Sequence, residues 1–138
     1  MHNGETSQVQ NARPLSPHLY VYKPEINMLM SIVHRATGAA LYFGTIALVI
    51  WLIATASSEE QYQAVNSMFA TLPGRLIVLG YTWALLHHMF GGIRHLIWDV
   101  GYAFNLSQIN YLCWFTLIAS LTCTVGIWVI ASGYEGVF

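Results

Sequence analysis

The chain has 138 residues, of which 56% are hydrophobic and only 8% carry a charge. A soluble domain carries about 25% charged residues, so this composition excludes an ordinary soluble domain and indicates an integral membrane protein. The formal net charge of −1 creates no basic field for nucleic acid, and we expect no nucleic-acid partner.

Residues 1–27 are polar, and we interpret them as an N-terminal arm outside the membrane. The arm has neither the apolar core of a signal peptide nor the arginine content of a mitochondrial transit sequence. We therefore expect a protein of the bacterial inner membrane, inserted through its own spans. A processed mitochondrial protein is the less favoured alternative.

Three apolar segments follow, at about 28–56, 76–98 and 109–131. Each reaches the roughly 20 residues that a membrane-spanning helix requires. In lipid, a chain this short satisfies its backbone only as helices. We predict an all-α domain over residues 28–138 with three transmembrane helices. Leu72, Pro73 and Gly74 are expected to end the first loop, in which a short helix is possible, and residues 101–107 form the second connection.

The few charged residues predict the orientation of the chain in the membrane. Basic residues precede or begin the first span and occur near the end of the second, whereas acidic residues occur in the first loop and the C-terminal tail. The positive-inside rule then places the N-terminus and the second connection in the cytoplasm. Arg75 is the exception to this pattern. The residues concerned are Arg13, Lys23, Arg35 and Arg94 on one side, and Glu59, Glu60 and Glu135 on the other.

Four histidines lie within these apolar segments: His34 in the first, and His87, His88 and His95 in the second. Ionisable groups at membrane depth cost several kcal/mol unless they are paired, ligated or hydrated. At about 100° per residue, His88 and His95 share one helix face, with Gly92 between them. A neutral imidazole is a good axial ligand for haem iron, and a glycine on that face leaves space for a flat macrocycle.

Helical periodicity alone does not choose between His87 and His88 as the ligand, because the two point about 100° apart. The alternative is a histidine that only hydrogen-bonds between helices. His34 is expected to be too shallow to match His88, so a second axial ligand would come from another polypeptide. Arg94 and His95, about two turns nearer the cytoplasm, could bind the haem propionates.

Ser31 and Arg35 lie one turn apart at the start of the first span, on one face with His34 beside them. A hydroxyl and a guanidinium can both donate to a carbonyl oxygen, and a quinone headgroup offers two such oxygens. The alternative interpretation is an arginine that obeys the positive-inside rule and a serine that caps the helix.

Three motifs together resemble the cytochrome b subunit of succinate dehydrogenase, the larger membrane anchor of respiratory complex II. They are RPLSPHLYVYK at 13–23, SIVHRATG at 31–38 and HMFGGIRHLIWD at 88–99. The resemblance implies a function in the tricarboxylic acid cycle and respiratory electron transport. It also implies three partners: a flavoprotein, an iron–sulfur protein and a second small membrane anchor.

By this resemblance, one haem b lies between the two anchors, each giving one histidine, so that the three helices form half of a haem-binding bundle. His88, seven residues before His95, would be the iron ligand. Ser31 and Arg35 would bind ubiquinone, and His34, Arg94 and His95 would neighbour the propionates or the pocket. No role follows for His87.

The chain has no dinucleotide fingerprint and no cysteine cluster for an iron–sulfur centre, so it holds no catalytic residue for succinate oxidation. Cys113 and Cys123 are expected to be small packing residues. Two alternatives are a haem-b anchor of another respiratory dehydrogenase and a purely structural anchor or transporter subunit.

Overall fold

A computed structural model describes residues 23–133, and over this range the chain forms four helices and no strand. The helices are α2 (Ile26–Ser57), α3 (Glu59–Ala70), α4 (Leu72–Asp99) and α5 (Leu106–Ser132). The predicted all-α class is confirmed. Most of the predicted N-terminal arm, residues 1–22, lies outside the described range.

Helices α2, α4 and α5 are each long and apolar enough to cross a membrane, in agreement with the three predicted spans. The largest difference is at α4, which begins at Leu72 rather than near residue 76. The Thr71 hydroxyl accepts a hydrogen bond from the Gly74 N–H at 3.2 Å and so caps the helix. Pro73 fits in the first turn because no intrahelical partner is needed for its nitrogen.

The first loop is largely the helix α3. The Ser58 hydroxyl caps this helix by accepting a hydrogen bond from the Gln61 N–H at 3.2 Å. Glu59 and Glu60 occupy the first turn, where negative charge interacts favourably with the helix dipole. The second connection is shorter than expected, because α5 already begins at Leu106. Gly101 turns the chain after α4 with a φ of 87°, a conformation that favours glycine.

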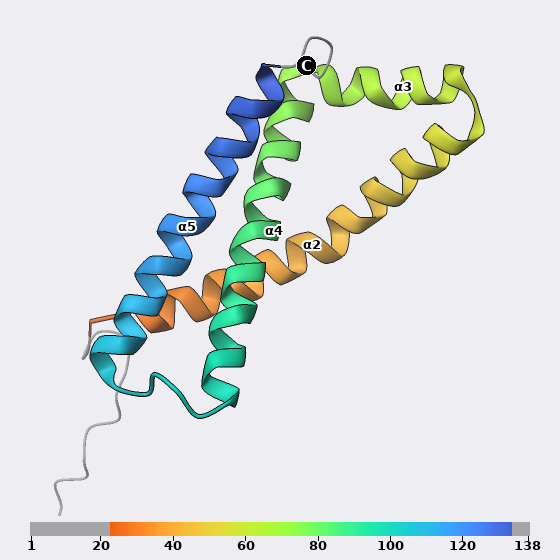
Figure 1. The fold of residues 1–138 in the computed structure, drawn as a ribbon. Coiled ribbons are helices and arrows are strands. Elements are labelled where there is room, and N and C mark those ends of the chain that lie inside the picture. Colours follow the sequence, from red (N-terminus) through yellow and green to blue (C-terminus); the bar gives the residue numbers. More distant parts are fainter. Residues whose placement is uncertain (1–22, 134–138) are drawn as a thin grey trace, which may run out of the picture.

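Figure 1 shows α5 running beside α4, whereas α2 crosses α4 obliquely and then diverges from it. The start of α2, the end of α4 and the start of α5 lie at one end of the molecule, which we call the crossing end. At the opposite end, α3 connects the end of α2 to the start of α4 (Figure 1). We call this the α3 end.

The interface between α4 and α5 is lined by small and polar side chains, whereas most large apolar side chains of the three long helices face outward. Such packing is typical of a membrane, where lipid is as apolar as leucine and small residues let helices approach closely. We call this interface the α4–α5 seam. Its buried members are Ala84, His87 and Arg94 on α4, and Cys113, Thr116, Ser120 and Thr124 on α5.

Candidate functional site

Three of the four membrane-depth histidines meet where α2 crosses α4. The His34 and His88 rings stack with their centroids 4.0 Å apart and their planes 5° from parallel. The His95 ring lies 5.2 Å from that of His34. The expectation that His34 is too shallow to reach His88 is therefore wrong. That expectation used only the position of each histidine along its own span, and in an oblique crossing residues at different distances from their helix ends can meet.

Two glycines allow this close crossing. A Cβ atom added at Gly38 would lie 3.0 Å from Cε1 of His88, and one added at Gly91 would collide with the His34 ring. Each histidine thus lies against a glycine of the opposite helix. The close approach of the two helix backbones therefore depends on glycine at both positions, and alanine at either one would push the helices apart.

The hydrogen bonds of His88 leave one ring nitrogen available. Nδ1 lies 3.2 Å from the backbone oxygen of His34 and 3.4 Å from the Thr37 hydroxyl. Because a carbonyl can only accept, Nδ1 carries the proton and Nε2 keeps its lone pair. Within residues 23–133, Nε2 has no hydrogen-bond partner. Histidine ligands of metals typically hold their other ring N–H against a carbonyl or carboxylate in this way.

The surroundings of His88 also fit a haem. A Cβ added at Gly92 would meet no atom within 4 Å, so the face between His88 and His95 is open, as the periodicity predicts. Iron binds in the plane of an imidazole ring, so the stacked His34 does not block Nε2. His88 is therefore a candidate haem ligand, with open space beside it at Gly92.

His87 faces in a different direction, into the α4–α5 seam. It is fully buried, with Nδ1 3.3 Å from the Ser120 hydroxyl and its ring 5.2 Å from that of Trp83. Its Nε2 has no partner, but seam side chains surround it and leave no room for a macrocycle. The geometry therefore favours His88 over His87 as the ligand, a choice that periodicity left open.

Arg94 also lies in the seam and is only 3% exposed. Its Nη1 donates to the Cys113 sulfur at 3.4 Å, and its guanidinium carbon lies 5.3 Å from the centroid of the Trp98 ring. Of the three predicted neighbours of the propionates, the fold thus brings His34 and His95 to His88, whereas Arg94 is turned toward α5.

Ser31 and Arg35 are both exposed on α2 at the crossing end. Arg35 Nε donates to the Ser31 backbone oxygen at 3.4 Å, which holds the guanidinium over the turn that carries the Ser31 hydroxyl. The neighbouring His34 reaches across to α4 instead. A hydroxyl and a guanidinium are thus presented together on the outer surface, one turn from the histidine cluster.

Two polar partners in this region were not singled out in the sequence. Thr37, which contacts His88, lies three residues after His34, so its position on that helix face was a usable signal. Ser120, the partner of His87, is one hydroxyl in an apolar run of α5 and carried no comparable signal. Residues 13–22 of the first motif lie outside the described range.

Residues 10–127 match the family described as the succinate dehydrogenase/fumarate reductase transmembrane subunit. The succinate dehydrogenase cytochrome b556 subunit of Rickettsia prowazekii (strain Madrid E) is 38% identical over 122 residues, 88% of this chain and 95% of the relative. That of Paracoccus denitrificans is 38% identical over 96 residues, 70% of this chain and 74% of the relative. The mitochondrial cytochrome b560 subunit of Sus scrofa is 36% identical over 123 residues, 83% of this chain and 69% of the relative. The chain therefore belongs to the succinate dehydrogenase/fumarate reductase transmembrane subunit family.

Proposed function

We propose that this chain holds one haem b through His88 and helps to form the site at which ubiquinone is reduced, as the membrane anchor of succinate dehydrogenase. Its place as a succinate dehydrogenase subunit follows from the family and from the relatives. Succinate oxidation itself belongs to other subunits of the complex. The Rickettsia and Paracoccus relatives support a bacterial inner membrane protein, and we place its N-terminus in the cytoplasm.

The observation that carries this proposal is the state of the His88 ring. Its Nδ1–H is held by the His34 carbonyl at 3.2 Å, its Nε2 has no partner among residues 23–133, and the adjacent face at Gly92 is open. A histidine that served only to join helices would be expected to use both nitrogens within the bundle.

In the proposed site, His88 Nε2 would hold the iron, and by the family resemblance a histidine of the second small membrane anchor would be the other ligand. A haem b bound there supplies one-electron redox chemistry. His34 and His95 lie beside His88 and can donate hydrogen bonds to the propionates. Arg94 would contribute positive charge from the α4–α5 seam, although its side chain is turned toward α5 and not toward His88.

Replacing the ligand tests the haem proposal. In the assembled complex, His88→Ala should lose or greatly weaken the reduced b-type haem bands, because it removes the ring whose Nδ1–H is held by the His34 carbonyl and whose Nε2 is left for the iron. The matched control is His87→Asn, which can keep a hydrogen bond to Ser120 and should retain the haem. A six-coordinate low-spin haem that persists in His88→Ala would refute the assignment and make His87 the next candidate.

Ser31 and Arg35 form the quinone part of the proposal. Both donate hydrogen bonds, and a charge-assisted bond from the guanidinium stabilises a carbonyl oxygen that gains electron density during reduction. Their exposed position on α2 leaves them accessible to the iron–sulfur partner, which would cover this end of the bundle and deliver the electrons. Water at the nearby membrane surface would supply the two protons that quinone reduction consumes.

The quinone assignment is tested by separating the two half-reactions. Arg35→Ala should lower ubiquinone reduction by roughly ten- to a hundredfold, the value of one charge-assisted hydrogen bond, and Ser31→Ala by less. Succinate oxidation with an artificial electron acceptor should stay at the wild-type rate. Equal loss of both activities would instead show an assembly defect and would contradict a direct role for these side chains.

A further inference from the structure

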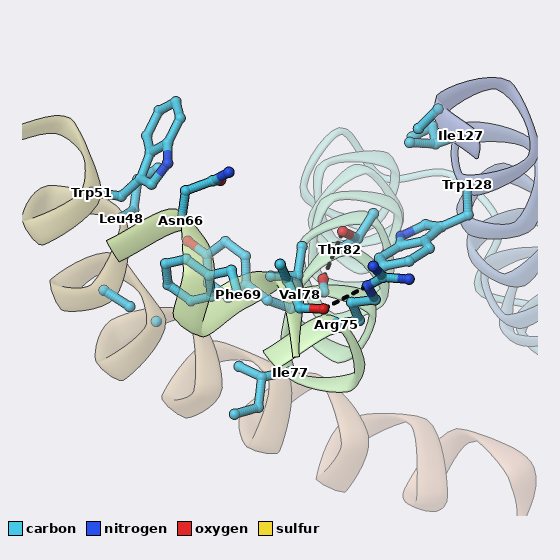
Figure 2. Close-up of a pocket in the computed structure, with 15 residues that line it drawn as sticks. Leu48, Trp51, Asn66, Phe69, Arg75, Ile77, Val78, Thr82, Ile127 and Trp128 are labelled. Carbon is cyan, nitrogen blue, oxygen red and sulfur yellow. Dashed lines mark hydrogen bonds between the residues drawn. The ribbon is translucent and has the colours of Figure 1, made fainter. Parts of the chain in front are cut away.

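A cavity lies at the α3 end of the molecule, away from the histidines. Its volume is about 440 Å³, within the range of small-molecule sites. All four described helices line it, as Figure 2 shows in close-up. Most of the lining is aliphatic or aromatic, with Leu48 and Trp51 from α2 and Phe69 from α3 among the larger side chains.

The cavity follows from the angle between α2 and α4. A Cβ added at Gly44 would collide with the Tyr81 ring, so the two helices still touch at that level. Beyond Gly44 they diverge toward the α3 end (Figure 1), and no side chain of the described chain fills the space between them.

Helix α3 forms the roof of this cavity. Its half-buried side chains are Tyr62, Val65, Asn66 and Phe69, which share one helix face, and Asn66 and Phe69 line the cavity itself. The corner that joins α3 to α4 is tightly built, because a Cβ at Gly74 would meet the backbone of Met68 and Phe69. The roof is thus fixed to α4, and the cavity is a feature of the fold.

The polar lining residues include Asn66 on α3 and Arg75 at the start of α4. Two tryptophans, Trp51 and Trp128, also line the cavity. Arg75 Nε donates to the Ala70 backbone oxygen at 2.9 Å, which holds the guanidinium at the junction of α3 and α4 (Figure 2). Tryptophan is typical of the depth at which lipid headgroups begin. Arg75 is also the basic residue that the charge pattern of the spans left unexplained.

We propose that this cavity binds a phospholipid, with an acyl chain in the apolar space and the phosphate beside Arg75. An empty apolar cavity is unfavourable because its lining side chains lose their contacts, and acyl chains are the material available at this depth. A cation in the lining of a mostly apolar cavity matches a ligand with an anionic head and an apolar tail. The two tryptophans place that head at the membrane interface.

Lipid retention by the complete purified complex tests the proposal. After detergent delipidation, native mass spectrometry should find a phospholipid still bound to the wild-type complex. Ala47→Phe and Ala131→Phe fill the cavity from α2 and α5, and each should abolish retention. Ala56→Phe adds the same bulk at an exposed position of α2 outside the lining and should retain the lipid. An unchanged haem spectrum verifies that each variant assembles.

The role of Arg75 is tested by adding lipid back to the delipidated complex. Arg75→Gln should weaken phosphatidylglycerol binding about tenfold, the lower end of the value of a charge-assisted hydrogen bond, because glutamine keeps an N–H donor and loses the charge. It should leave diacylglycerol, which lacks the phosphate, unaffected. The proposal is overturned if the wild type retains no lipid, if retention survives in both filled variants, or if filling the cavity displaces quinone rather than phospholipid.

Discussion

At the scale of single residues, Gly38 controls the orientation of the proposed iron ligand. A Cβ there would lie 3.0 Å from Cε1 of His88, so Gly38→Ala should push the ring away from α2 and stretch its hydrogen bond to the His34 carbonyl. We expect a destabilisation of about 1–3 kcal/mol, as for other overpacked sites. We also expect a shifted haem midpoint potential, since the partner of Nδ1 tunes the ligand. Redox titration of the assembled complex measures that shift.

Gly80→Ala is the matched control for this substitution. Gly80 lies in α4, and a Cβ there would meet no atom within 4 Å, so its haem potential should equal that of the wild type. If both variants had the same potential as the wild type, the contact between Gly38 and His88 would have no influence on the haem.

Among single residues, helical periodicity predicted the shared face of His88, Gly92 and His95, because that relation depends only on residues of one helix. The same periodicity could have separated Arg94 from this face. Arg94 follows His87 by seven residues, as His95 follows His88, so Arg94 and His87 belong together, and both lie in the α4–α5 seam. The contact with Ser120 depends on how α5 packs and could not be predicted from spacing.

At the scale of helices, length and apolar composition predicted the three spans but not their ends. Helix α4 begins earlier than expected because Thr71 caps it and Pro73 fits in its first turn. The crossing of α2 and α4 was also missed, since a crossing angle is a property of two packed surfaces. It depends on the glycines at 38, 44 and 91, each of which lies against an aromatic or imidazole ring of the opposite helix.

The same crossing gives α2 two different environments along its length. At the crossing end, it lies against α4 closely enough to stack His34 on His88. At the α3 end, it stands away from α4 and borders the cavity. One oblique helix thus produces both the histidine cluster and the proposed lipid site, and α3 is needed to span the gap that the obliquity creates.

At the scale of the whole molecule, few side chains are buried between the three long helices. In α2, only Met30, Thr37 and Ala54 are buried, and large side chains such as Tyr42, 72% exposed, and Phe43, 68% exposed, point outward. Lipid can cover such a surface, but the His88 face also presents the proposed iron ligand, for which this proposal places the second ligand on another subunit. The bundle is therefore suited to pack against another membrane subunit through the face that carries His88.

Expression without the second small membrane anchor tests this inference on the whole chain. The six-coordinate low-spin haem spectrum should be lost, because the second axial ligand is then missing, while the chain still inserts into the membrane as three apolar spans. Optical and electron paramagnetic resonance spectra of isolated membranes measure the change, and restoring the anchor should restore the spectrum. A low-spin haem formed by this chain alone would contradict the shared site. In that case His34, whose ring already stacks on His88, would be the ligand to replace next, and loss of the low-spin signal in His34→Leu would place both axial ligands in one subunit.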